Sequence, residues 1–359
     1  QVHDIGLHLK KNDKGEIGFA VYVGGGQGRT PMIAKKIRDF LPEEDLLSYT
    51  TAIMRVYNLH GRRDNKYKAR IKILVHETGA EELSRQVEVE FAELKNTELK
   101  LPDADIAAIS AYFAPPELKN RPEGWESLAR WKKADEGFAR FVDQNVQPHK
   151  HPDYGMVTIS LKPIGGIPGD ATDEQMELVA DIAEEYAFDE IRISHEQNII
   201  LPHVALADLE PVYRALAGAG LATANAGLIT DIIACPGLDY CALANARSIP
   251  VAQEISTRFG APERQAEIGE LKIKISGCIN ACGHHHVGHI GLLGVEKKGE
   301  ELYQITLGGS GDENTSIGEI IGRGFEPEKV TDAVEVIVNT YLGLRLDPSE
   351  IFLDAYRRV

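Results

Sequence analysis

The chain has 359 residues, of which 43% are apolar and 26% charged, so it is long enough for about two or three domains with substantial cores. Its formal net charge of −16 argues against nonspecific nucleic-acid binding, because phosphate contacts need a basic surface. Neither a secretory signal pattern nor an apolar run of membrane-spanning length is present, so a cytoplasmic location without a membrane partner is expected.

The beginning of the chain matches a segment near its end at an offset of about 284 residues, which indicates an internal repeat. Each copy is predicted to form a strand, a Gly-rich turn, a second strand, a Gly-Gly loop and a helix. The second copy is preceded by more of its domain than the first, so the first domain is expected to lack its N-terminal part. The matching segments are I-G-L at 5–7 and 290–292, K-G-E at 14–16 and 298–300, and Y-V-G-G-G at 22–26 with T-L-G-G-S at 306–310.

The helix of each copy is marked by a proline in its first turn, at Pro42 and Pro327. The apolar stripe of each helix is expected to pack into a core. The stripes consist of Leu46, Tyr49, Ile53 and Val56 in the first copy and of Val330, Val334, Ile337 and Tyr341 in the second.

A basic segment, R-R-D-N-K-Y-K-A-R-I-K, occupies residues 62–72 and stands out in an acidic chain. One interpretation is a solvated charged loop that runs into a strand. The other is a carboxylate-binding site, because Arg and Lys are the natural donors to carboxylates.

The middle of the chain is predicted to contain a small α+β module. Thr172 and Gln175 form a capping-box pattern that starts a helix reaching about residue 186. The order β-α-β-β-α is typical of a ferredoxin-like module. The predicted elements are a Pro-rich connector at 112–125, a helical arm at 126–145, strands at 155–161, 190–194 and 197–201, and a second helix near 206.

The four cysteines of the chain form two pairs, Cys235 with Cys241 in C-P-G-L-D-Y-C and Cys278 with Cys282 in G-C-I-N-A-C-G. The x5 and x3 spacings fit zinc-ribbon knuckles poorly, and a cytosolic setting disfavours disulfides. A four-thiolate iron–sulfur site is favoured, although zinc and inert thiols remain open.

The surroundings of the pairs add to this prediction. The alternating L-K-I-K-I at 271–275 predicts a strand that leads into the second pair. Gly277 and Gly283 would let the backbone approach a bulky group. The alanine-rich stretch from Cys241 predicts a helix whose N-terminus would lie beside an anionic cluster.

The two cysteine motifs resemble those of the sirohaem/4Fe-4S sulfite and nitrite reductases, and the resemblance extends over essentially the whole chain. It implies an α+β fold in which a ferredoxin-like module lies between two related α/β domains of the sulfite/nitrite-reductase type. We therefore expect a truncated first sirohaem/4Fe-4S-type domain at 1–111, a connector at 112–150, the module at 151–225, and a second sirohaem/4Fe-4S domain with the cluster cysteines at 226–359.

The resemblance also implies the cofactors, a 4Fe-4S cluster and sirohaem, and the residues that hold them. The four cysteines carry over as cluster ligands, and Cys282 carries over as the catalytic bridge to the sirohaem iron. Asn280 is expected to lie against the sirohaem. The basic residues expected to contact its carboxylates are Arg63, Lys66, Arg70 and Lys72, together with Arg192 in the stretch I-R-I-S-H-E-Q-N.

Members of this family are oxidoreductases, so the resemblance implies the six-electron reduction of sulfite to sulfide, or alternatively of nitrite to ammonia. The electron donor is expected to be ferredoxin or an NADPH flavoprotein. In the family most substrate-binding bases precede the part matched here, so activity is expected of the parent protein rather than of this piece alone.

Two further alternatives belong to other classes of protein: an iron–sulfur electron-transfer module without sirohaem, and a zinc-bound structural module. The histidines that follow Cys282, namely His284, His285, His286 and His289, could bind a metal. Because the cluster and haem already fill the site, contacts to haem propionates are favoured instead, and these histidines are not expected to be iron ligands.

Overall fold

The computed structural model describes residues 1–359 and divides into two compact units. The first unit comprises Gln1–Pro115 with Ser310–Ile317, and the second comprises Pro116–Gly309 with Gly318–Val359. Helices and sheets are mixed in both, in agreement with the predicted α+β class. None of the helices combines the length and the apolar character needed to cross a bilayer.

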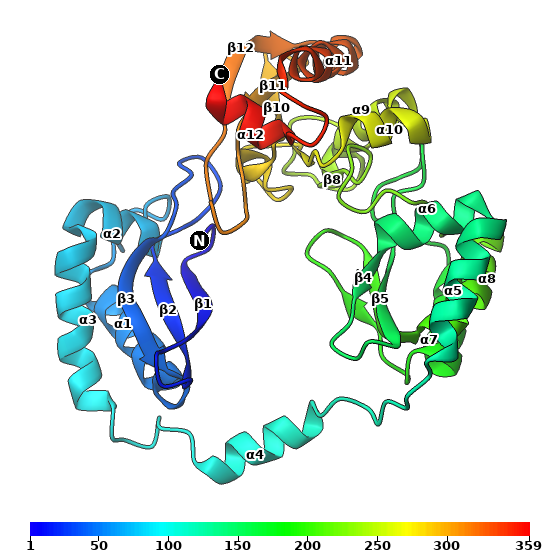
Figure 1. Cartoon of the computed structure of the whole chain (residues 1–359). Helices are drawn as coiled ribbons and strands as arrows, with labels where there is room; N and C mark the ends of the chain where they lie inside the picture. Colours follow the sequence, from blue (N-terminus) through cyan, green and yellow to red (C-terminus); the bar gives the residue numbers. More distant parts are fainter. The chain divides into compact units, whose positions relative to one another are not determined.

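The first unit is built on an antiparallel sheet of order β1-β2-β3, formed by Ile5–Lys11, Ile17–Val23 and Lys35–Pro42. After a short 3-10 helix, η1 (Glu43–Asp45), the chain forms α1 (Leu46–His60), α2 (Ile71–Thr78) and α3 (Ala80–Leu94), which lie beside the sheet in Figure 1. Their buried side chains form one core, which includes Val21, Val23, Tyr49, Ile53, Val56, Val87 and Phe91.

Two features of the first unit differ from the prediction. Strand β3 was not predicted, because K-K-I-R-D-F-L-P carries charges on both faces and is held only at the edge of the sheet, by β2. The basic segment runs into helix α2 rather than into a strand. The buried residues of α2 follow helical spacing: Ile71, Lys72, Leu74 and Val75. An apolar run this short fits a helix and a strand about equally well, so the sequence could not decide between them.

Helix α4 (Asp103–Tyr112), which buries none of its residues, and a Pro-rich stretch lead to the second unit. The predicted single helical arm is two helices, α5 (Glu123–Ala134) and α6 (Glu136–Asn145). The break occurs because Asp135 caps α6, its carboxylate accepting from Phe138 N at 3.0 Å. Phe138 and Phe141 then bury in the core of the next module, and β4 (Val146–Pro148) pairs with its first strand.

The ferredoxin-like module follows the predicted order: β5 (Tyr154–Ile159), α7 (Asp173–Tyr186), β6 (Arg192–Ile193), β7 (Ile199–Ala205), and α8 (Leu209–Gly218) after the 3-10 helix η2 (Leu206–Asp208). The sheet has the order β4-β5-β7-β6. The capping box predicted at Thr172 is present, and Thr172 Oγ1 accepts from Gln175 N at 3.2 Å.

We expect Thr172→Ala to lower the free energy of unfolding by about 1 kcal/mol, because the first turn of α7 loses the acceptor for Gln175 N. Urea denaturation measures the change. Thr257→Ala in α9 is the matched control, because its hydroxyl bonds only within the helix, to Gln253 O, and a change within about 0.5 kcal/mol is expected. Equal losses in both variants would contradict the capping role.

The remainder of the second unit is a five-stranded sheet of order β12-β11-β10-β9-β8. Strands β8 (Ile233–Ala234), β9 (Ile273–Ser276) and β10 (Ile290–Lys297) are parallel neighbours, while β11 (Glu300–Leu307) and β12 (Glu319–Phe325) pair antiparallel. Helices α9 (Ser248–Arg258), α10 (Pro262–Ile268), α11 (Pro327–Leu344) and α12 (Phe352–Arg358) complete it.

The internal repeat is visible in the fold. In each copy three consecutive antiparallel strands precede a helix, β1-β2-β3 before α1 and β10-β11-β12 before α11. The third strand, β12, was missed in the second copy as β3 was in the first. Pro327 is the first residue of α11, as predicted, whereas Pro42 ends β3 and precedes the 3-10 helix η1.

Candidate functional site

The two cysteine pairs follow neighbouring parallel strands. Strand β8 ends at Ala234, immediately before Cys235, and β9 ends at Ser276, shortly before Cys278. Cys235 N donates to Ile275 O at 3.1 Å, so the beginnings of the two loops are joined directly. Because the carboxyl ends of parallel strands meet at one edge of a sheet, both pairs emerge at the same place.

The first cysteine loop does not form the helix predicted at Cys241. Gly237–Asp239 makes one 3-10 turn, η3, and the chain then turns until α9 begins at Ser248. Gly237 has a φ of 60°, and its carbonyl accepts from Cys241 N at 2.9 Å. The N–H of Cys241 is thus bonded within the turn, and the alanine-rich stretch that follows does not form a helix.

The second cysteine loop is fixed by its two glycines. A Cβ atom on Gly283 would lie 1.8 Å from Ile275 O, and one on Gly277 would lie 2.7 Å from Ala246 O. Gly283 N donates to Ser276 Oγ at 3.1 Å, and Gly277 O accepts from Ala246 N at 3.0 Å. These glycines are thus required where protein backbone crosses protein backbone, whatever group the loop holds.

The four thiols influence one another electrostatically. The pKa of the Cys282 thiol is raised by burial and, in smaller measure, by the thiols of Cys235, Cys278 and Cys241. All four cysteines are free thiols, Cys282 is the exposed one, and Cys278 is buried. The effect of the other three thiols on Cys282 indicates that the four sulfurs lie close together, and four neighbouring cysteine sulfurs fit an iron–sulfur centre, which takes four thiolates.

The ferredoxin-like module holds the strand that leads to Cys235. The carboxamide of Gln197 pairs with the backbone of Ala234, donating to its O at 3.0 Å and accepting from its N at 3.1 Å. Nearby, the buried Lys162 ammonium lies 2.7 Å from Asp231 Oδ1. Side chains of one module thus fix the backbone that carries the first cysteine pair.

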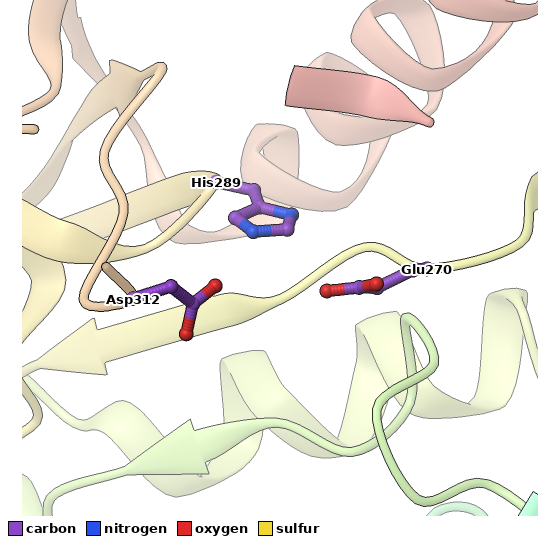
Figure 2. Close-up of side chains that lie close together, drawn as sticks. All are labelled: Glu270, His289 and Asp312. Carbon is purple, nitrogen blue, oxygen red and sulfur yellow. The ribbon is translucent and has the colours of Figure 1, made fainter. Parts of the chain in front are cut away.

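The histidines after Cys282 lie in or beside the 3-10 helix η4 (His285–Val287). His289 Nδ1 accepts a hydrogen bond from Lys272 N at 3.2 Å. Figure 2 shows the His289 ring near Glu270, which lies on the segment just before β9. His285 is fully buried, neither ring nitrogen has a hydrogen-bond partner, and burial lowers its pKa to about 3. It therefore stays neutral at physiological pH.

Stability is expected to fall as the pH drops from about 6.5 toward 3, because the unfolded chain binds a proton at His285 that the folded chain excludes. Urea denaturation at about pH 7 and about pH 5 measures the change. In His285→Leu the difference between the two pH values should be smaller than in the wild type. An undiminished pH dependence in His285→Leu would refute this role.

The basic residues predicted as cofactor contacts each have a protein partner. Arg63 lies over the Tyr57 ring at 4.7 Å, and Lys66 lies over the Tyr67 ring at 5.2 Å. Arg192 pairs with Glu190 at 2.6 Å on the surface of the ferredoxin-like module. The other predicted cofactor residue, Asn280, is exposed on the turn between Cys278 and Cys282.

Arg70 and Lys72 come together beside the glycine-rich loop that follows β2. Lys72 is buried and donates to Gln27 O at 2.7 Å and to Thr30 O at 2.6 Å, whereas Arg70 pairs with Asp4 at 2.7 Å. A Cβ on Gly26 would lie 3.0 Å from Lys72 Cδ and 3.1 Å from Arg70 Nη2. The side chains of Arg70 and Lys72 thus pack against the same side of this loop, at Gly26.

A cavity of about 430 Å³ lies next to this pair within the first unit. Lys72 lines it together with Lys35 and His76, two basic residues that were not predicted. Lys35 is the first residue of β3, and His76 lies in α2. Because neither the strand nor the helix was predicted, the sequence did not place these two residues beside Lys72. Burial lowers the pKa of Lys72.

Comparison with known families gives two matches. The family described as "Nitrite and sulphite reductase 4Fe-4S domain" matches residues 1–95 and 226–349, and "Nitrite/Sulfite reductase ferredoxin-like half domain" matches residues 148–219. The first match falls on both copies of the internal repeat and includes all four cysteines. The second falls on the module between them.

Individual relatives of both substrate types are similar to the chain. Sulfite reductase (ferredoxin) 2 of Mycolicibacterium paratuberculosis is 25% identical over 96% of the chain and 57% of the relative. The ferredoxin–nitrite reductase of Synechococcus elongatus is 27% identical over 95% and 61%. The solved structure of the Mycobacterium tuberculosis NirA protein matches the whole fold with a TM-score of 0.75 at 20% identity, covering 100% of this chain and 60% of that one. The chain thus spans about three fifths of these proteins' length.

Proposed function

Because the chain belongs to the nitrite and sulphite reductase family, we propose that it forms the cluster-bearing part of an enzyme that reduces sulfite to sulfide. The observation that carries the proposal is the meeting of Cys235, Cys241, Cys278 and Cys282 at the ends of β8 and β9. Reduction of nitrite to ammonia on the same cofactors is the second candidate, because the relatives include enzymes named for each substrate.

The four thiolates would hold a 4Fe-4S cluster, and Cys282 would also join it to the iron of a sirohaem. Support comes from the exposure of Cys282, whose sulfur is open to a second group while Cys278 is buried. Asn280 is exposed on the same turn and would lie against the haem. When bound, the two cofactors pass single electrons to the small anion; the protein places them and excludes other ligands.

Arg70 and Lys72, with Arg63 and Lys66 nearby, would bind carboxylates of the sirohaem. Charge and position support this role, since Arg70 and Lys72 flank Gly26 and Lys72 borders the cavity. Ammonium and guanidinium groups form strong, charge-assisted hydrogen bonds with carboxylates. Arg192, on the ferredoxin-like module, would be a further contact if its bond to Glu190 opens.

The electron donor would be a ferredoxin, because the relatives of both substrate types are named for ferredoxin. An NADPH flavoprotein is the alternative. Reduction of the purified protein by each donor in turn, followed in the visible spectrum, separates the two.

The decisive experiment measures steady-state turnover of the intact parent protein with sulfite and with nitrite, using a chemically reduced dye as donor, together with metal analysis. We expect iron, acid-labile sulfide and a Soret-type absorption band, with higher turnover on sulfite. Higher turnover on nitrite would favour the second candidate. Iron and sulfide without the band would indicate an electron-transfer module, and one zinc without iron would indicate a structural module.

A further inference from the structure

A buried hydroxyl group, that of Ser248, lies beside the first cysteine. Ser248, the first residue of α9, has no exposed surface, so its Oγ must find its hydrogen-bond partner within the protein. Serine near a helix start commonly accepts from backbone N–H groups, yet α9 has no such side-chain cap. Ser248 Oγ instead forms a hydrogen bond with Cys235 Sγ, at 3.5 Å.

The backbone that carries Ser248 is held firmly in place. Arg247, the residue before it, donates its N–H to Glu301 Oε1 at 2.7 Å, and its carbonyl accepts from the Tyr303 hydroxyl at 2.5 Å. Tyr303 is itself fully buried, and its hydroxyl oxygen also lies 2.5 Å from Glu301 Oε1. Strand β11, which carries both Glu301 and Tyr303, therefore fixes the start of α9, and the position of the Ser248 hydroxyl does not depend on a loose end.

The direction of the contact follows from the chemistry of the sulfur. In the free thiol either atom could donate, but a thiolate bound to iron has no proton and can only accept. Gly277 N already donates to Cys235 Sγ at 3.0 Å. With a thiolate at Cys235, the contact can run only from the hydroxyl to the sulfur, so Ser248 would be a second donor to Cys235 Sγ beside Gly277 N.

We propose that Ser248 donates a hydrogen bond to the Cys235 thiolate and thereby raises the reduction potential of the bound 4Fe-4S cluster. The inference rests on the proposed function, because it requires the cluster. Adding an electron increases the negative charge on the cysteine sulfurs, so a donor stabilises the reduced cluster more than the oxidised one. Ser248 is thus a positioning residue that acts through Cys235.

The test is a redox titration of the full chain, reconstituted with iron and sulfide and followed by the electron paramagnetic resonance of the reduced cluster. Ser248→Ala is expected to shift the one-electron equilibrium about tenfold toward the oxidised cluster, which corresponds to about 59 mV. Ser248→Thr and Ser248→Val form a matched pair of nearly equal shape that differs in the hydroxyl. Thr should keep the wild-type potential, and Val should shift as Ala does.

Ser256→Ala is the control for the general effect of removing a buried serine hydroxyl. Ser256 lies on the same helix, and its Oγ accepts a hydrogen bond from Gly165 N at 3.2 Å rather than contacting a cysteine. Its potential should equal that of the wild type. A loaded Ser248→Val protein with an unchanged potential would overturn this inference alone, as would an equal shift in Ser256→Ala. A wild-type chain that takes up no iron and sulfide would overturn the proposed function and this inference together.

Discussion

Replacing Cys282 with serine in the intact parent protein is expected to reduce turnover by at least about a hundredfold with either anion, the size of effect that loss of one essential catalytic group has in other enzymes. A serine hydroxyl ionises far less readily than a thiol and is a poor ligand for iron. Cys282 is the exposed cysteine of the four. In the proposed arrangement its loss removes a cluster ligand and the bridge to the haem at once.

The measurement combines steady-state turnover with iron and sulfide analysis of the same sample. Cys278→Ser is the matched comparison, because Cys278 is buried and would only hold the cluster. We expect both variants to lose cluster iron, and any Cys282→Ser protein that retains its cluster to be inactive still. Wild-type turnover in such a sample would show that Cys282 is not the bridge.

Lys162→Met is expected to lower the free energy of unfolding by about 3–5 kcal/mol, because it leaves a buried carboxylate without its cation. Lys162 and Asp231 have side chains that are only 2% and 4% exposed, and Nζ lies 2.7 Å from Oδ1. The ammonium also donates to Glu196 O and to Asn198 Oδ1. Burial lowers the pKa of Lys162, and the nearby Asp231 carboxylate opposes that shift.

Urea denaturation of the wild type and variant measures this loss. Lys132→Met provides the control, because Lys132 pairs with Asp143 at the surface, where the two side chains are 33% and 65% exposed. An exposed pair of this kind contributes at most about 1 kcal/mol. Comparable losses in the two variants would refute the claim that burial makes the Lys162 pair important.

The parts of the fold that could be predicted from sequence are those specified by short stretches of chain. The capping box at Thr172 and Gln175 needs only residues three apart, and the structure has the predicted bonds. The strand before the second cysteine pair is likewise marked by its own alternation. The spacing of the cysteines in two pairs predicted a four-thiolate site, and the structure places the pairs after the neighbouring strands β8 and β9.

The parts that could not be predicted depend on contacts between distant residues. Strand β3 exists because β2 offers a hydrogen-bonding edge, not because K-K-I-R-D-F-L-P is a strong strand former. The stretch after Cys241 would suit a helix, yet the bonds from Ala246 N and Cys241 N hold it as a turn. The approach of Ser248 to Cys235 depends on that turn and on Tyr303, so neither spacing nor composition could reveal it.

Because Gln197 pairs with the backbone of Ala234, the segment that carries the cysteines depends on the ferredoxin-like module for its structure. A piece that started at residue 226 would keep every cysteine, but it would lose both the carboxamide that completes β8 and the ammonium that neutralises Asp231. A chain cut between the two modules would therefore lack part of the structure that holds the two cysteine loops in place. The shortest piece expected to assemble a cluster therefore includes the ferredoxin-like module.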